Sequence, residues 1–452
     1  MAIARCPCAG GLTLLERMWS VSPNTEEKQM TTNGPNSLAR FQILERISAS
    51  APAIEGMENE IHRVLSSLDF ARDSFKGRSI AVTAGSRGVA NLKLITRAIC
   101  AWLAAQGARP FVFPAMGSHG GATAECQRKI LQDFGVTEDF IGAPIRSSME
   151  TVSLGVTPEG FPAFIDGLAY EADGIVVAHR VKPHTGFSGS IESGLLKMMA
   201  VGMGKEDGAR ECHRAFRRDG YEAVIRAVSA LSLASRKILC GLAVIENEMH
   251  QICSVRAARP EGMVALDEAC LTEARRLVPR LPFQNIQFLI VDEIGKNISG
   301  TGMDAKVVGR GAQHQPGEAP EIDLIYARDL TAESGGNALG VGMADFIHQR
   351  LRGKIDFDKT YVNGRTSMSH QLVRLPMVLA SDREALDFAL AALGGPAPSE
   401  QSVIRIKNTQ NLQRIAVSER LAREASGLAG WRLSEDMFLP QLDSKGDLVS
   451  FA

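Results

Sequence analysis

Short apolar runs alternate with amphipathic segments from residue 79 onward, and this pattern predicts an α/β fold. Apolar residues recur at helical spacing in 92–107 and 123–135, and each predicted helix ends at a glycine, Gly107 or Gly135. Around these helices lie predicted strands, at 79–85, 110–116, 174–181 and 237–247. Alternating strands and helices are typical of a parallel sheet with crossover helices.

A second alternating set follows a helix predicted at 263–281. Its predicted strands and helices are the strands 286–295, 322–330, 377–381 and 402–408 and the helices 337–351 and 383–394. We therefore predict two α/β domains with parallel-type sheets, at 38–285 and 286–452, and an active site in the crevice between them. The polar, turn-rich segment 1–37 is predicted to be a disordered tail.

The length, charge and hydrophobicity of the chain bear on its domain count and on whether it binds nucleic acid or membranes. A chain of 452 residues exceeds one typical core, which agrees with two or three domains. The formal net charge of -1 gives no attraction to nucleic acid or to an anionic membrane, and no apolar run reaches the roughly 18–20 residues that span a bilayer. We therefore predict no nucleic-acid and no membrane partner, and the oligomeric state stays open.

The cysteines favour a reducing compartment. There are eight, and six of them are scattered, several within apolar segments, which favours buried thiols over a disulfide framework. Cys6 and Cys8 are close together, but they lack the second pair of a typical zinc site. We therefore predict a cytoplasmic protein and give this pair little weight as a metal site.

Basic and imidazole side chains recur where the predicted strands end. The four are Arg87 in GSRG, His119 in GSHGG, His184 in RVKPH and Lys296 in DEIGKN, each near a glycine or proline. Ligands of parallel α/β sheets bind beyond the carboxyl ends of the strands. We therefore expect these four side chains to point into one crevice.

Each of these side chains also has a plainer structural explanation. Arg87 can grip a phosphate or carboxylate through two parallel hydrogen bonds, or it can be a surface arginine in a turn. His119 suits proton transfer near neutral pH, or it can merely cap the next helix. His184 can be a buried histidine with satisfied hydrogen bonds, and His179 at the end of the same strand competes for its role.

The segment from His179 to Arg214 also holds Lys197 and His213. Lys197 lies in the apolar run GLLKMMAVGMG, where its amine either reaches solvent or is held in a cavity and can react. His213 lies in a predicted helix, and one histidine is too few ligands for a protein metal site. A metal bound here would need further donors from a cofactor or from elsewhere in the chain.

Four segments of the chain resemble the lactate racemase family: GSRG, AMGSHG, RVKPHTGFSGSIESGLLKMM and DEIGKNISGTGMD. The resemblance extends over most of the chain from about residue 40. It implies two α/β domains with an active site between them and a nickel-pincer nucleotide cofactor, in which nickel is bound by two sulfurs, a ring carbon and one histidine. Sulfur donors in a square-planar set suit nickel.

The resemblance assigns the cofactor contacts. Lys197 matches the lysine that tethers the cofactor, and His213, 16 positions later, matches the nickel ligand. Arg87 matches an arginine of the loop beside the cofactor phosphate and the substrate. Because the cofactor brings three donors, His213 alone completes the site. The segment before Lys197 is SGSIESGLLK where founding members have GGRK, which indicates a divergent branch.

The resemblance also implies a reaction, racemisation or epimerisation at C2 of a 2-hydroxy acid. His119 and His184 match the two catalytic histidines, each of which would remove the hydroxyl proton of one enantiomer. The C2 hydrogen would pass as hydride to the cofactor and return to the opposite face of a planar 2-keto acid. Arg87 and Lys296 would hold the substrate carboxylate meanwhile.

Two other functions stay open. A homologue without nickel chemistry could bind a small carboxylic acid or a phosphometabolite. Asp292 and Glu293 follow a predicted strand and could serve a metal-dependent hydro-lyase with the histidines, although carboxylates at a strand end also cap helices. The P-loop pattern is absent and no well-placed GxGxxG is present, which weighs against ordinary nucleotide cofactors.

Overall fold

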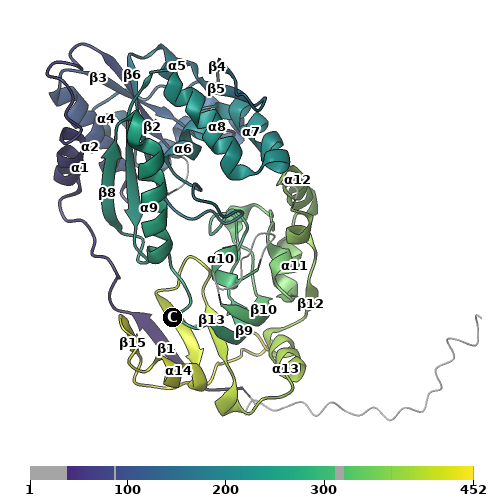
Figure 1. The fold of residues 1–452 in the computed structure, drawn as a ribbon. Coiled ribbons are helices and arrows are strands. Elements are labelled where there is room, and N and C mark those ends of the chain that lie inside the picture. The colour runs from purple at the N-terminus through teal and green to yellow at the C-terminus, as the bar shows by residue number, and fades with distance from the viewer. Residues whose placement is uncertain (1–37, 86–87, 311–319, 368, 451–452) are drawn as a thin grey trace, which may run out of the picture. The chain divides into compact units, whose positions relative to one another are not determined.

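The computed structural model describes residues 38–85, 88–310, 320–367 and 369–450 (Figure 1). The described strands form two main sheets and one two-stranded hairpin. The predicted tail at 1–37, which includes Cys6 and Cys8, lies outside the described residues.

The smaller sheet has the strand order β3-β2-β6-β7-β8, and its neighbours are parallel except for β7 and β8. Its strands are β2 (Ser79–Ala84), β3 (Arg109–Pro114), β6 (Gly174–Arg180), β7 (Ile238–Glu246) and β8 (Ile252–Ala258). Successive residues of β2 point to opposite faces, since Ile80 and Val82 join one apolar cluster and Ala81 joins another. Both faces are therefore buried, as is usual for parallel strands.

Helices cover both faces of this sheet (Figure 1). The cluster around Ile80 contains side chains from α1 (Met57–Ser66), α2 (Leu92–Ala105), α3 (Ala124–Asp133) and α4 (Glu138–Ile141). The cluster around Ala81 contains side chains from α5 (Gly167–Glu171), α6 (Leu195–Lys197), α7 (Lys205–Asp219), α8 (Tyr221–Ala234) and α9 (Met263–Leu277). The hairpin of β4 (Thr151–Val156) and β5 (Pro162–Asp166) adds to this second cluster.

The larger sheet has the strand order β12-β11-β10-β9-β13-β14-β1-β15. Its parallel strands are β9 (Asn285–Val291), β10 (Glu321–Ala327), β11 (Phe346–His348), β12 (Met377–Leu379) and β13 (Val403–Ile406). Its antiparallel strands are β14 (Arg414–Ser418), β1 (Phe41–Arg46) and β15 (Trp431–Leu433). Its helices are α10 (Ala305–Val308), α11 (Gln349–Lys354), α12 (Phe357–Ser367), α13 (Asp382–Ala392) and α14 (Glu419–Ala425).

Several single-turn helices complete the secondary structure. The 3₁₀ turns are Gly120–Ala122, Pro260–Gly262, Ala332–Ser334, Val341–Met343, His370–Val373 and Pro398–Glu400. A π-helical turn, Met198–Gly202, joins α6 to the segment that leads into α7. Such turns are rare and frequently mark functional positions.

The α/β fold class is confirmed, and most of the predicted elements are present. The predicted helices at 92–107, 123–135, 263–281 and 383–394 correspond to α2, α3, α9 and α13. The predicted strands correspond to β2, β3, β6, β7, β9, β10, β12 and β13. The antiparallel strands β1, β14 and β15 and the β4–β5 hairpin were not predicted, because their short runs carry no clear period.

The helix predicted at 337–351 is wrong. The structure has the 3₁₀ turn Val341–Met343, then β11, and then the start of α11. Gly340 has φ 104, which is left-handed, and a Cβ at Gly342 would lie 2.1 Å from the carbonyl oxygen of Gln371. The backbone therefore turns where the apolar spacing predicted a continuous helix, and pairing of β11 with β10 and β12 fixes the next residues as a strand.

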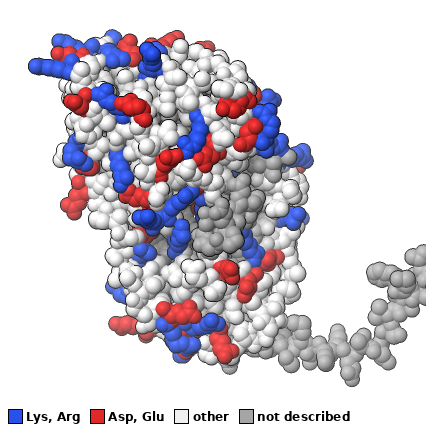
Figure 2. All heavy atoms as spheres, viewed as in Figure 1, with Lys and Arg blue, Asp and Glu red and all other residues white. Residues whose placement is uncertain are grey.

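The division into domains at 38–285 and 286–452 stays a prediction. β1, on the N-terminal side of that division, pairs with β14 and β15 in the larger sheet. The chain therefore begins and ends its described part in the same sheet. Within the described residues, no helix combines the length and apolar composition needed to cross a bilayer. On the face seen in Figure 2, acidic and basic side chains are interspersed.

The start of α6 is held by a side chain from another helix. Asp267 of α9 is buried, and its carboxylate oxygens accept hydrogen bonds from the backbone N–H groups of Leu195 and Leu196, both at 3.0 Å. These are N–H groups that a helix cannot satisfy internally. The carboxylate approaches so closely that a Cβ at Gly194 would lie 2.0 Å from Asp267 Oδ1. Asp267 thereby fixes where the helix bearing Lys197 begins.

Replacing Asp267 with asparagine should alter how stability depends on pH. Burial raises the pKa of Asp267 from 3.8 to about 6, so between these values the folded chain binds more protons than the unfolded chain. Stability contributed by this group is therefore lost as the pH rises through that window. The quantity to follow is the free energy of unfolding of the wild type minus that of Asp267→Asn. We expect this difference to fall by up to about 3 kcal/mol between about pH 4 and about pH 7.

Denaturant titrations followed by circular dichroism would measure this difference. Leu195→Ala is a matched control, because it weakens the same helix without changing a titratable group. Its loss of stability should not vary with pH. A pH-independent difference for Asp267→Asn as well would contradict the raised pKa.

Candidate functional site

One cavity of about 710 Å³ collects most of the predicted site residues. It is lined by His184, Lys197, His213 and Lys296, together with other residues of segments 180–221 and 296–410. The first three follow β6, and Lys296 follows β9. Ligands of parallel α/β sheets bind beyond the carboxyl ends of the strands. The cavity lies where this rule predicts a site, both for β6 of the smaller sheet and for β9 of the larger sheet.

His184 lies in the loop after β6 with its ring held at two points. Its Nδ1 accepts a hydrogen bond from the backbone N–H of Gly186 at 3.0 Å, and its ring lies 4.5 Å from that of Phe187. Because Nδ1 accepts, the neutral ring carries its proton on Nε2. His184 in this state can donate a hydrogen bond to a ligand oxygen.

Lys197 is the last residue of α6 and is half-buried. Its Nζ lies 5.5 Å from the centre of the Phe187 ring, within range of a cation–π contact. Lys197 lines the cavity, and the reactivity of its amine stays a prediction.

His213 lies on α7, and the structure confirms that its segment is helical. His213 is exposed and lines the cavity. Desolvation, and then the positive charge of Lys197, lower the pKa of His213. The imidazole is therefore neutral at pH 7, which is the form that binds a metal.

Stacked aromatic rings connect His184 to His213. Phe187 stacks on Tyr221 at 4.3 Å, Tyr221 stacks on Phe216 at 4.5 Å, and Phe216 lies 5.6 Å from His213. Aromatic pairs at these distances stabilise each other beyond their burial. The sequence analysis missed this wall, because the rings come from a loop and from both sides of the α7–α8 junction.

Lys296 and Lys306 reach the cavity from the segment after β9. The Lys296 ammonium donates to the carbonyl of Gly300 at 2.5 Å, and the backbone N–H of Lys296 donates to Ser334 Oγ at 2.9 Å. Lys306, at the second position of α10, also lines the cavity. The sequence did not predict that Lys306 lines the cavity, because nothing in its local sequence distinguishes it from a surface lysine.

Two predicted residues remain. His119 is exposed on the loop after β3 and is not among the described residues that line the cavity, and Arg87 lies outside the described residues. A Cβ at Gly85 would lie 3.1 Å from the His179 ring, so His179 packs beside Gly85, directly after β2. The catalytic role of His119 and the binding role of Arg87 stay predictions.

A buried charge network lies beneath the His119 loop. Gln127 donates to the carbonyl of His119 at 3.0 Å and accepts from the ammonium of Lys205 at 3.2 Å. Lys205 has no solvent exposure; its Nζ lies 3.1 Å from Asp166 Oδ2 and 2.6 Å from the carbonyl oxygen of Pro114. Desolvation lowers the pKa of Lys205 and raises that of Asp166, opposed in both cases by their mutual attraction.

The carboxylates proposed for a metal-dependent hydro-lyase have other partners. Asp292 accepts from Arg328 at 2.6 Å and from Arg405 at 2.8 Å, and Glu293 accepts from the side-chain amide of Asn408 at 2.8 Å. Because Asp292 is already bound by two guanidinium groups, it offers a poor position for a cation.

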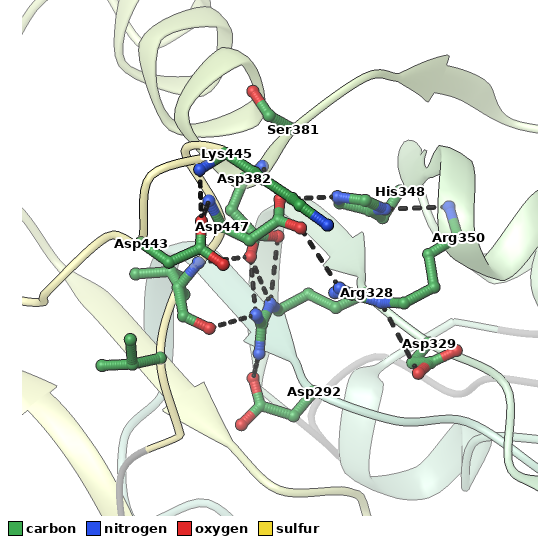
Figure 3. Close-up of polar contacts among 12 residues, drawn as sticks. Asp292, Arg328, Asp329, His348, Arg350, Ser381, Asp382, Asp443, Lys445 and Asp447 are labelled. Carbon is green, nitrogen blue, oxygen red and sulfur yellow. Dashed lines mark hydrogen bonds and ion pairs between the residues drawn. The ribbon is translucent and has the colours of Figure 1, made fainter.

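A second group of potential ligands is also engaged (Figure 3). His348, Asp382 and Asp447 have ligand atoms within 4.8 Å of one another. However, Asp382 accepts from Arg328 at 2.6 Å and from the Tyr326 hydroxyl at 2.6 Å, and His348 Nε2 lies 2.8 Å from Asp447. This group is a satisfied structural network away from the cavity, and we do not assign it a metal.

Removing the cation of the buried pair should cost much stability. Lys205→Met would leave the Asp166 carboxylate buried without its partner, and we expect a loss of about 3–5 kcal/mol in the free energy of unfolding. The double variant Lys205→Met/Asp166→Asn keeps the oxygen that caps Ala169 and removes the orphaned charge. It should recover most of the loss in urea titrations, and equal losses in both variants would contradict this account.

The chain is similar to known proteins in both sequence and structure. Residues 41–223 match the lactate racemase N-terminal domain. Among proteins of curated function, none matches the chain in sequence. A structural genomics protein from Thermotoga maritima is 13% identical, over 72% of this chain and 83% of its own. Its TM-score is 0.48, which is too low to support a conclusion.

A solved structure of the lactate racemase apoprotein from Thermoanaerobacterium thermosaccharolyticum is more similar. It has a TM-score of 0.51 at 15% identity, over 83% of this chain and 99% of its own. At this identity the likeness shows a shared fold. In sequence, residues 41–223 of this chain are similar to the lactate racemase N-terminal domain, and in structure the chain shares the fold of this apoprotein.

Proposed function

We propose that this protein is a racemase or epimerase of 2-hydroxy acids that works with a nickel-pincer nucleotide. The observation that carries the proposal is the convergence of His184, Lys197, His213 and Lys296 on one cavity. The positive charge of Lys197 adds to desolvation in lowering the pKa of His213. The proposed tether and the proposed metal ligand both line this cavity.

The residues present fit such a cofactor. A cavity of about 710 Å³ is of the size that holds a nucleotide-sized molecule with a small acid. His213 offers a neutral imidazole, Lys197 offers an amine, and the Phe187–Tyr221 wall offers flat faces to a planar ring. When bound, the cofactor would supply an acceptor that takes the C2 hydrogen as hydride and returns it.

The charge of the cavity favours an acidic substrate. Among its described lining residues one is acidic, Asp304, and five are basic: Arg180, Lys182, Lys197, Lys296 and Lys306. Two of these five form ion pairs with acids that are not among the lining residues, Arg180 with Glu246 and Lys306 with Glu192. The Lys296 ammonium lies at this cavity and donates to the carbonyl of Gly300. We assign Lys296 and Arg87 to the substrate carboxylate.

His184 serves as an acid–base group at the C2 oxygen. As a base, His184 would take the hydroxyl proton at Nδ1, for which its ring must release the Gly186 N–H, and it would later return that proton from Nδ1 to the C2 oxygen. His119 is proposed as the group for the opposite face. Because it is exposed outside the cavity lining, its loop must move for it to act.

A cytoplasmic location is part of the proposal. The six cysteines in the part of the chain that the structure describes are all free thiols. Free thiols are usual in a reducing compartment.

The cofactor assignment predicts opposite phenotypes for two variants. After co-expression with the enzymes that make the cofactor, the wild type should carry an adduct in intact-mass analysis and bound nickel in metal analysis. Lys197→Arg keeps the charge but should carry no adduct. His213→Ala should keep the adduct and lose nickel.

The result that would overturn the cofactor assignment is a wild type with neither adduct nor nickel. If calorimetry then showed binding of a small carboxylic acid, the non-catalytic homologue would be the correct interpretation.

The reaction itself predicts the fate of the C2 hydrogen. With C2-deuterated 2-hydroxy acids, the product that has lost optical activity should still carry deuterium at C2. If the enzyme instead removed the C2 deuterium as a deuteron, that deuterium would exchange with water. His184→Gln should slow the reaction by about 10²–10⁴-fold. His62→Gln, on α1, is the matched control and should leave the rate unchanged. Washout of deuterium would rule out hydride transfer.

A further inference from the structure

Glu192 is a buried acid at the base of the loop that carries His184. Its side chain has no solvent exposure, and one carboxylate oxygen accepts a hydrogen bond from the backbone N–H of His184. The other oxygen accepts from the N–H of Gly189 at 3.3 Å. Paired backbone hydrogen bonds between Lys182 and Ser193 close the ends of the same loop. Glu192 therefore holds the middle of a loop that is already closed at its ends.

Two cations of different origin share this carboxylate. Arg275 of α9 donates to it at 2.5 Å and also donates to the carbonyl of Gly189 at 2.5 Å. Lys306 of α10 lies 3.1 Å from it. A buried carboxylate needs such partners, because its desolvation is otherwise costly. Arg275 belongs to the elements around the smaller sheet, whereas Lys306 comes from the segment that follows β9 of the larger sheet.

The segment with Lys306 contributes the other wall of the cavity. Lys296, Thr301, Asp304 and Lys306 all line it. The Glu192–Lys306 contact is thus an ion pair between the loop that positions His184 and the segment that positions Lys296. We propose that Glu192 is a positioning residue and that its ion pair with Lys306 couples these two segments. The effect of Glu192 on catalysis rests on the proposed function, whereas the coupling of the two segments does not.

Hydrogen–deuterium exchange of the full chain without cofactor tests the coupling directly. Lys306→Met removes the contact between the segments and should raise exchange in peptides from both 182–193 and 296–308. Arg275→Met is the matched control, because it removes a contact within the smaller-sheet elements, and it should raise exchange in 182–193 alone. Lys306→Arg keeps a cation and should restore the wild-type pattern.

The proposal is overturned if Lys306→Met leaves exchange of 182–193 unchanged. It is also overturned if the rise is uniform along the chain, which would report general destabilisation. Lys306 is partly exposed, so this variant disturbs packing less than a change at Glu192 would.

A kinetic arm tests positioning in the loaded enzyme. Lys306→Met and Glu192→Gln should lower kcat by about 10–100-fold, because small misplacement of reacting groups has effects of this size. KM should change less than kcat, and Lys306→Arg should recover most of the rate. If the wild type is inactive, the proposed function fails and the exchange data still decide the coupling. An active Lys306→Met with unchanged kcat would overturn the positioning role.

Discussion

The carboxylate of Asp267, buried against two backbone N–H groups of α6, determines where Lys197 lies. The loop from β6 becomes helical at Leu195 because Asp267 satisfies the first free N–H groups of the turn. Two residues later the chain presents Lys197 to the cavity, and the π-helical turn at Met198–Gly202 redirects it toward α7 and His213. The spacing between the proposed tether and the proposed metal ligand thus depends on Asp267, about 70 residues further along the chain. Without this tertiary contact, the first N–H groups of α6 would lack a partner.

The site uses buried charge in the same way at three positions. Asp267 bonds the backbone of α6, Glu192 bonds the backbone of the His184 loop, and Lys205 reaches the His119 loop through Gln127. Burying each charge opposes folding, and each is compensated by backbone groups or by an opposite charge. What results at the start of α6 and in the His184 loop is preorganisation, since both are held by hydrogen bonds that solvent cannot compete for.

The two sheets contribute different properties to the cavity. The elements around the smaller sheet bring the imidazoles, Lys197 and the aromatic wall, while the segment after β9 brings Lys296 and Lys306. Behind the other strand ends of the larger sheet, Arg328 binds both Asp292 and Asp382 (Figure 3), so the acidic groups there are neutralised within the fold. Separately, the described residues that line the cavity include more basic than acidic side chains, which suits a carboxylate ligand.

The sequence by itself determined the strands β2 and β3, the helices α2 and α3, and the helix that bears His213. These are local properties, because burial on one face imposes a period on neighbouring residues. It could not determine that Phe41–Arg46 pairs with Arg414–Ser418, that 337–351 turns instead of forming a helix, or that His119 stands outside the cavity lining. The tertiary structure alone decided that Glu192 meets Lys306 across 114 positions. Local periodicity specifies which faces are buried, whereas pairings between distant segments depend on complementary surfaces that exist only once the chain has folded.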